Sequence, residues 1–180
     1  MTNTEDFHVC EFEVIRDTRE QAPWHFRDIP ATKEQGGGVN LINVIDRALT
    51  TGDYSISGLE SSVCVERKSV PDLTNCIVGD RKRFRKQLDR LNEVESGHVV
   101  VEGDWAAVFR EMESRGKVSR MALVSVVSWA MRYVPAVHWW FLPGKRPAEI
   151  LTFRLLEYAH KMRSLGLLKD CEADGEDDPP

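Results

Sequence analysis

The sequence has few cysteines and none of the spacings that bind zinc. Its four cysteines, Cys10, Cys64, Cys76 and Cys171, are scattered along 180 residues, and no two of them form a C-x-x-C pair. Structural zinc sites built on cysteine need closely spaced pairs of this kind. The sequence therefore predicts a protein of the reducing cytosol that has no structural zinc.

A membrane span and an export signal are also missing. The most apolar stretch, MALVSVVSWAMRYVPAVHWWFLP, contains Arg132 and is broken by Pro135, so it divides into a helix and a strand. The first residues, MTNTEDFHVCEF, lack the basic start and apolar run of a signal peptide. We expect an intracellular protein, cytoplasmic or associated with the nucleoid, that is not secreted and has no membrane partner.

Excess positive charge, which is typical of proteins that bind nucleic acid, is absent from the overall composition. The net charge is −5, but segment 170–180 alone carries six acidic residues and no basic ones, which leaves the other 169 residues near +1. Segment 81–90, RKRFRKQLDR, concentrates six basic residues against one acidic residue. We therefore expect one domain over residues 1–168, an acidic disordered tail over 169–180 and a basic helix within the domain.

Hydrophobic patterns predict strands first and then strands that alternate with helices. Two early strands joined around Gly58 are expected to form a hairpin, and 98–103 (HVVVEG) is typical of a central, parallel strand. Segment 39–52 is ambiguous and is interpreted as a short helix that ends at Gly52. This order indicates an α/β sheet covered on both faces. The hairpin strands are expected at 53–58 and 61–68, and two further strands are expected at 12–17 and 136–143. The expected helices are 69–78, 81–91, 104–114, 120–134 and 146–166.

Charged side chains stand where the predicted strands end. Glu66 and Lys68 are two residues apart, so they share one face of a strand, whereas Arg67 points to the other face or the rim. If the two strands pair as a hairpin, Asp53 at the start of the neighbouring strand converges with Glu66. Asp17 and Glu20, at the end of the first strand, can supply further oxygens.

A set of carboxylates without histidine or cysteine fits hard cations such as Mg²⁺ or Mn²⁺. Such a cation activates water and stabilises charge on a phosphate, and Lys68 is placed to neutralise the transition state. The pattern therefore indicates phosphodiester hydrolysis. Taken alone, an Asp after Gly is commonly a turn residue, and an E-R-K triplet is commonly the charged edge of a sheet. The hypothesis of a nuclease site therefore depends on the two motifs occurring together.

Four segments carry a resemblance to a known family: RDTRE (16–20), TGDYSI (51–56), VERKSVPDL (65–73) and RFRKQLDRL (83–91). They closely resemble the nuclease domain of the XPF/Mus81 group, also called the ERCC4 domain, with its GD…ERKxxxD pattern. That group belongs to the restriction-endonuclease-like PD-(D/E)xK superfamily. The resemblance implies a mixed central sheet flanked by helices. It also implies a metal-dependent endonuclease that cuts branched or flap DNA near junctions of single and double strands.

The resemblance also implies roles for individual residues. Asp53 and Glu66 would be the principal metal ligands, with Asp17 as a further ligand, and Lys68 would be the catalytic lysine. Arg83 and Gln87 match positions that face the cleft, although a solvated helix face is the alternative for Arg83. The implied catalytic set is Asp17, Glu20, Asp53, Glu66, Arg67, Lys68 and Asp72, and the expected DNA-binding set is Arg81, Lys82, Arg83, Arg85, Lys86 and Gln87.

Two features leave alternatives open. The sequence shows no signal for the helix-hairpin-helix motifs that the family usually appends, so DNA would be held by the nuclease domain, a dimer or a separate partner. The family also forms dimers, and the segments VSVVSWAMRYV and HWWF are candidates for a homodimer interface or for ordinary core. The other hypotheses are a non-cutting DNA-binding or scaffolding subunit and a related nuclease of another specificity, such as a junction resolvase or a restriction enzyme.

Overall fold

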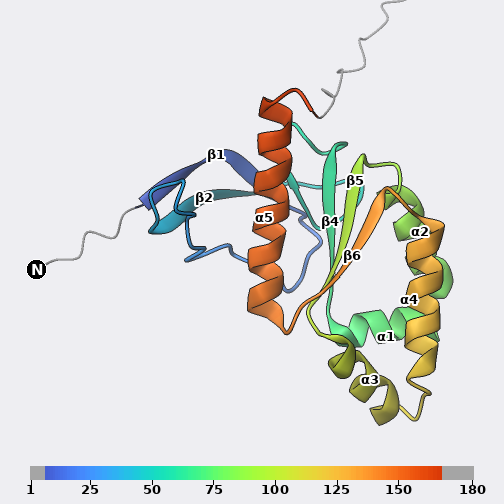
Figure 1. Cartoon of the computed structure of the whole chain (residues 1–180). Helices are drawn as coiled ribbons and strands as arrows, with labels where there is room; N and C mark the ends of the chain where they lie inside the picture. The colour runs from blue at the N-terminus through green and yellow to red at the C-terminus, as the bar shows by residue number, and fades with distance from the viewer. Residues whose placement is uncertain (1–6, 168–180) are drawn as a thin grey trace, which may run out of the picture.

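The computed structural model describes residues 7–167 and has a mixed, six-stranded sheet between two layers of helices (Figure 1). The strand order is β2-β1-β3-β4-β5-β6, and β3 is antiparallel to both neighbours whereas the other pairs are parallel. This confirms the predicted α/β class with a mixed central sheet. The predicted tail over 169–180 lies outside the described residues. The strands are β1 (Phe7–Arg16), β2 (Val39–Asp46), β3 (Tyr54–Ile56), β4 (Val63–Lys68), β5 (Ser96–Val101) and β6 (Val137–Phe141).

Helices cover both faces of the sheet, as the sequence predicts. The long helix α5 packs on the face that carries Val65 and Val100, and the four other helices pack on the face that carries Val99 and Val101 (Figure 1). Both faces of β5 are therefore buried. No helix within residues 7–167 is long and apolar enough to cross a bilayer. The helices are α1 (Val70–Val78), α2 (Arg81–Leu91), α3 (Trp105–Ser114), α4 (Arg120–Arg132) and α5 (Lys145–Ser164).

The interpretation of 39–52 as a helix was wrong. Val39–Asp46 forms β2, which runs parallel to β1 in a register from Phe7↔Val39 to Arg16↔Asp46. Its β-branched residues favour extended backbone, and β1 offers hydrogen-bond partners on both sides of an irregularity between Val9 and Glu13, whereas a short isolated helix is marginal. Correspondingly, β1 begins at Phe7, earlier than the expected start at residue 12.

The predicted hairpin is present and fixes the position of Asp53. Strands β3 and β4 pair antiparallel at Tyr54↔Val65, and Gly58 in the connecting turn has a left-handed φ of 81° that favours glycine. The backbone N–H of Asp53 donates to the Val65 carbonyl at 2.7 Å, which continues the pairing by one residue. Asp53 therefore lies beside the carboxyl-terminal half of β4.

A buried histidine makes the stability of this fold depend on pH. Burial, and then the neighbouring His138 ring with its centroid 5.3 Å away, lower the pKa of His98 from 6.5 to about 4. Because the folded-state pKa is lowered, its contribution to stability is present above pH 6.5 and is lost as the pH falls towards 4. The expected loss is about 3 kcal/mol of unfolding free energy over this window.

The measurement is urea unfolding of the wild type and His98→Gln at several pH values between 4 and 7. Glutamine keeps an acceptor for the indole N–H of Trp140, which donates to His98 at 3.2 Å, but it does not titrate. The difference in unfolding free energy between the two proteins is therefore expected to change with pH. A difference that stays constant across the window would contradict this role for His98.

Candidate active site

The predicted acidic residues meet in one cleft at the ends of β1, β3 and β4. The cleft has a volume of about 530 Å³. Asp17 follows β1, Asp53 precedes β3, and Glu66 and Lys68 belong to β4. It is lined by residues within 17–22, 50–53 and 66–68, by Asp72, and by the α2 side chains Arg83, Gln87 and Arg90. The topology thus brings together segments that are far apart in the sequence.

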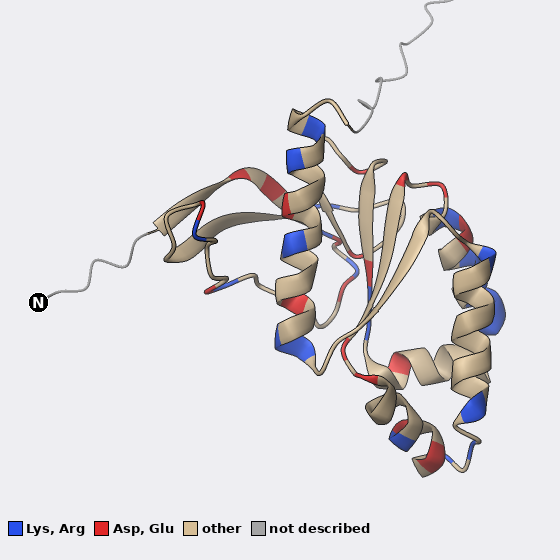
Figure 2. Cartoon of the chain, in the orientation of Figure 1, with Lys and Arg blue, Asp and Glu red and all other residues tan. Residues whose placement is uncertain are grey.

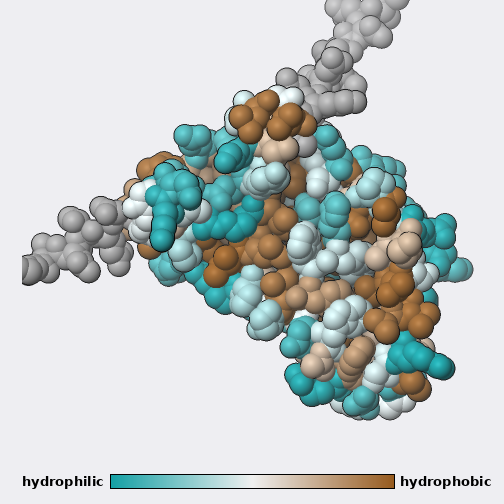
Figure 3. All heavy atoms as spheres, viewed as in Figure 1, coloured by the Kyte–Doolittle hydropathy of each residue, from teal (hydrophilic) through white to brown (hydrophobic). Residues whose placement is uncertain are grey.

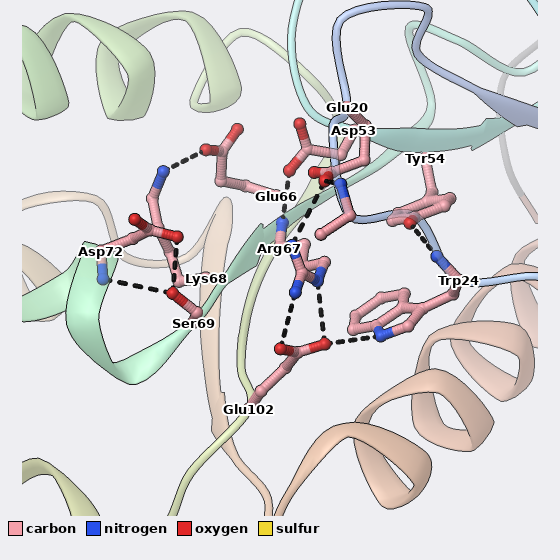
Figure 4. Close-up of polar contacts among 11 residues, drawn as sticks. Glu20, Trp24, Asp53, Tyr54, Glu66, Arg67, Lys68, Ser69, Asp72 and Glu102 are labelled. Carbon is pink, nitrogen blue, oxygen red and sulfur yellow. Dashed lines mark hydrogen bonds and ion pairs between the residues drawn. The ribbon is translucent and has the colours of Figure 1, made fainter.

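The alternation along β4 separates two kinds of interaction, as predicted. Lys68 reaches the Glu66 carboxylate, with Nζ 2.6 Å from Oε1, on the face that is covered by α1 and α2 (Figure 4). Arg67 points away from them and pairs with Glu102 (Figure 4). Burial alone would lower the pKa of Lys68, but the charge and hydrogen bond of Glu66 outweigh it and raise that pKa. Lys68 is therefore held as a cation.

Asp53 faces the same site and is fixed by backbone contacts on both sides. Its carbonyl accepts from the Asp17 N–H at 2.8 Å, and its Oδ2 accepts from the Arg67 N–H at 2.7 Å. Burial, and then the charge of Glu66, raise the pKa of Asp53 well above its usual value. A buried carboxylate whose ionisation is disfavoured in this way by burial and a neighbouring carboxylate is a group that a bound cation would stabilise.

The residues present fit a hard divalent cation. Asp53 Oδ1 and Glu66 Oε2 accept no hydrogen bond from any side chain or backbone group among residues 7–167, so each carboxylate has an oxygen to offer. In the same described range, no three carboxylate, histidine or cysteine side chains form a ready-made metal cluster. A site of two carboxylates is suited to Mg²⁺ or Mn²⁺, because these ions keep several water ligands.

Asp17 has a different set of partners from the one predicted. Its two carboxylate oxygens accept from the backbone and guanidinium of Arg19 at 2.8 Å and from the Leu49 N–H at 2.7 Å. The hydrogen bonds with Arg19 are the main reason why the pKa of Asp17 is lowered to about 2. Its four acceptor positions are thereby occupied. The geometry favours Asp17 as an anchor for the 17–20 turn over the predicted role as a metal ligand.

Arg67 organises the wall of the cleft opposite to Lys68. Its guanidinium pairs with Glu102 at 2.7 Å and with Glu20 at 3.2 Å, and it lies 5.8 Å from the centre of the Trp24 ring. The Trp24 indole N–H also donates to Glu102 at 2.7 Å (Figure 4). Glu20 and Arg67 are thus held in an ion-pair network whose other members, Glu102 and Trp24, the sequence did not predict. The only available signal was the position of Glu102 directly after a buried strand.

Asp72 lies in the first turn of α1, where it bonds to the capping residue Ser69 and lines the cleft. Ser69 Oγ accepts from the Asp72 N–H at 3.2 Å and donates to Asp72 Oδ2 at 2.6 Å. The cap ends β4 at Lys68 and turns the chain into α1. Asp72 is therefore near the site, as the sequence predicts, with one carboxylate oxygen engaged by Ser69.

The basic helix α2, whose ribbon is blue at its Lys and Arg positions in Figure 2, carries an outer and an inner set of side chains. Arg81 is inner, because its guanidinium donates to Ser125 Oγ at 2.7 Å and lies 5.1 Å from the Trp129 ring centre. The geometry thus assigns Arg81 to helix packing, in place of the predicted DNA contact. Arg90, which the sequence did not single out, lines the cleft with Arg83 and Gln87. The exposed basic residues of the predicted set are Lys82, Arg83, Arg85 and Lys86.

Comparisons with known proteins show which family and fold this chain shares. A curated relative, the 3'-flap repair endonuclease Xpf of Saccharolobus solfataricus, is 36% identical over 113 residues, which cover 62% of this chain and 42% of the relative. The chain thus matches less than half of that protein's length. A solved structure of XPF from Aeropyrum pernix has a TM-score of 0.61 at 21% identity and covers 85% of this chain and 69% of the other.

A second structure, of XPF from Aeropyrum pernix in complex with DNA, has a TM-score of 0.56 at 23% identity and covers 89% of this chain and 68% of the other. Both structures show that the fold is shared. The family model of the ERCC4 domain matches residues 16–151, which include all the site residues described above. The chain therefore belongs to the ERCC4 domain family.

Proposed function

We propose that this protein is a metal-dependent endonuclease that hydrolyses phosphodiester bonds in branched or flap DNA. The single observation that carries the proposal is the juxtaposition of Asp53, Glu66 and the charged Lys68 in one cleft with basic α2 side chains. The family supports it, because the curated relative is named a 3'-flap repair endonuclease and a structural neighbour was solved with DNA.

Each residue of the site has a task in this reaction. Asp53 and Glu66 would hold Mg²⁺ or Mn²⁺, which when bound supplies an activated water and charge neutralisation at the phosphate. Lys68 keeps its proton, so it acts as a fixed positive charge that stabilises the developing charge on a phosphate oxygen. Arg67, which also lines the cleft, pairs with Glu102 and holds β4 in place. Asp72 and Glu20 complete the walls of the cleft.

The decisive experiment compares labelled flap, fork, four-way-junction and linear duplex DNA with and without Mg²⁺ or Mn²⁺. The proposal expects metal-dependent cleavage of the flap or fork in preference to linear duplex. Binding of all substrates without cleavage would replace it with a non-cutting DNA-binding subunit. Preference for the four-way junction or for one duplex sequence would instead indicate a resolvase or restriction-type nuclease.

Basic residues of α2 are expected to contact the DNA backbone. Replacing Arg83 or Lys86 by alanine should weaken DNA binding and lower the slope of log affinity against log salt concentration by about one for each lost phosphate contact. Fluorescence anisotropy over a salt series measures this slope. Arg110→Ala, an exposed charge on α3 outside the cleft, is the matched control. An equal loss in the control would show that only net charge matters.

The exposed face of α4 supports a homodimer. Leu123, Val124, Val127 and Met131 are between 43% and 72% exposed, and hydrophobic atoms gather over this helix (Figure 3). Trp129, on the inner side of α4, is buried in the core of the domain. Only the inner side of the segment VSVVSWAMRYV therefore serves as ordinary core. A second copy that covers this face would give a mass near twice 20.5 kDa by light scattering. A mass of one chain at all concentrations would reject the dimer.

A further inference from the structure

The outer face of α2 carries positive charges that the domain itself leaves unpaired. In the part of the chain that the structure describes, none of these exposed cations forms an ion pair, whereas Arg16 and Arg67 each pair with a carboxylate. The one carboxylate of the helix, Asp89, accepts from the Tyr133 hydroxyl at 2.6 Å. The exposed cations are Lys82, Arg83, Arg85, Lys86 and Arg90.

Spacing along the helix makes this face suitable for a polyanion. Lys82, Lys86 and Arg90 follow one another at intervals of four residues, so they form a row with a repeat of about 6 Å along the helix axis. Like charges at this spacing repel one another and destabilise the helix. A polyanion whose charges repeat at a similar distance would relieve this repulsion.

One polyanion belongs to the chain itself. The acidic segment, residues 170–180, carries six carboxylates and no cation. Four of the carboxylates alternate with uncharged residues, and alternate side chains of an extended chain repeat about every 6.6 Å. The acidic segment therefore complements the α2 row in both sign and spacing. The four are Asp170, Glu172, Asp174 and Glu176.

The acidic segment is long enough to reach α2. Residues 168–180 follow the described part of the chain, and an extended chain of this length spans up to about 45 Å. At the end of α5, Arg163 donates to the Gly58 carbonyl at 2.7 Å. After α2, the Glu95 N–H donates to the Ser61 carbonyl at 3.1 Å. Gly58 and Ser61 are at most about 11 Å apart, so the ends of α5 and α2 lie close together.

We propose that the acidic segment docks on the outer face of α2 of its own chain and competes there with the DNA backbone. The docking depends on charge and reach alone, and the competition rests on the proposed nuclease function. Arg83 and Arg90 also line the cleft, so an occupied face restricts access to the site. Because the segment is tethered, its effective concentration is on the order of 1 mM, and a Kd of about 0.1 mM for the face would weaken DNA binding about tenfold.

A nitroxide spin label on Cys171 tests the docking without any DNA. Cys10→Ser removes a partly exposed cysteine, and Cys64 and Cys76 are buried. At a salt concentration of about 50 mM, the label is expected to broaden the amide signals of residues 82–90. At about 500 mM these signals should recover, because salt screens the attraction between exposed charges.

Two charge reversals locate the contact. Lys86→Glu should remove the broadening, and Arg110→Glu, at an exposed position on α3, is the matched control and should keep it. Equal broadening of α2 and α3, or broadening that Lys86→Glu leaves unchanged, would overturn the docking. Spin-labelled chains that broaden α2 of unlabelled chains mixed with them would assign the segment to a second copy and overturn docking within one chain.

The competition with DNA is measured by fluorescence anisotropy with a flap substrate. Two triple variants with the same change in net charge are compared. The variant of the acidic segment should bind DNA about fivefold to tenfold more tightly than the wild type at low salt. The control should change the affinity by less than about twofold, because its charges lie away from α2. The first variant is Glu172→Gln, Asp174→Asn and Glu176→Gln, and the control is Glu11→Gln, Asp28→Asn and Glu34→Gln.

The outcomes separate this inference from the proposed function. Equal effects of the two triple variants would reduce the change to net charge and overturn the competition. If neither the wild type nor the variants bind DNA, the proposed function fails, and the spin-label experiment still decides whether the acidic segment docks on α2.

Discussion

Replacing Asp53 by asparagine is expected to lower the rate of metal-dependent cleavage by about a thousandfold, because loss of a principal ligand removes several kcal/mol of transition-state stabilisation. The substitution keeps the size of the side chain and an oxygen that can accept from the Arg67 N–H. It removes the charge that faces Glu66. Single-turnover cleavage of a flap substrate at saturating Mg²⁺ measures the effect.

The same variant has a second readout that does not depend on catalysis. A bound cation stabilises the wild type, by about 2.7 kcal/mol at a hundredfold excess over its dissociation constant. Asp53→Asn should lose most of this gain, and its metal-free form should be no less stable than the wild type, because the repulsion with Glu66 is relieved. Thermal unfolding with and without Mg²⁺ measures both.

A matched control separates the loss of a ligand from the loss of any carboxylate. Asp46→Asn removes an exposed carboxylate that ends β2, pairs with Arg16 and does not line the cleft, and it should leave cleavage and the effect of Mg²⁺ unchanged. Full activity of Asp53→Asn, or an undiminished stabilisation by Mg²⁺, would show that Asp53 is not a ligand.

Much of the site follows from local rules that the sequence displays. The period of two along a strand places Glu66 and Lys68 on one face, and the hairpin brings Asp53 alongside them. Both depend on residues fewer than twenty positions apart. The buried strand β5 and the helix stripe of Phe84, Leu88 and Leu91 were predicted for the same reason, since each is a short, strongly periodic pattern.

The parts that could not be predicted depend on long-range contacts. β2 becomes a strand because β1 pairs with it, a tertiary contact that outweighs an ambiguous local pattern. The partners of Asp17 include Leu49, and those of Arg67 include Glu102, which are 32 and 35 residues away. The sequence shows that Asp17, Arg67 and Glu102 are charged, but it does not show which groups they contact in the fold. Arg81 shows the same limit, because its contact with Ser125 turns it away from the DNA-binding set.

Lys68→Met is the second variant with a large expected effect, because the side chain has both a catalytic and a structural partner. Cleavage should fall by about a hundredfold to a thousandfold, as expected for the loss of one group that stabilises transition-state charge. The variant also leaves the buried carboxylate of Glu66 without its cation, and breaking a buried ion pair costs about 3–5 kcal/mol. Single-turnover cleavage and urea unfolding of the same preparations measure the two effects.

A second substitution distinguishes the loss of cleavage from the loss of stability. Adding Glu66→Gln to Lys68→Met removes the stranded charge, so most of the lost stability should return, since replacing both members of a buried pair is far less costly than removing one. Cleavage should not return, because the double variant has neither the cation of Lys68 nor the carboxylate of Glu66. If cleavage rises together with stability, Lys68 acts through the fold alone. If stability returns and cleavage stays low, the lost stability is not the cause of the lost cleavage, and the charges of Lys68 and Glu66 act on the reaction directly.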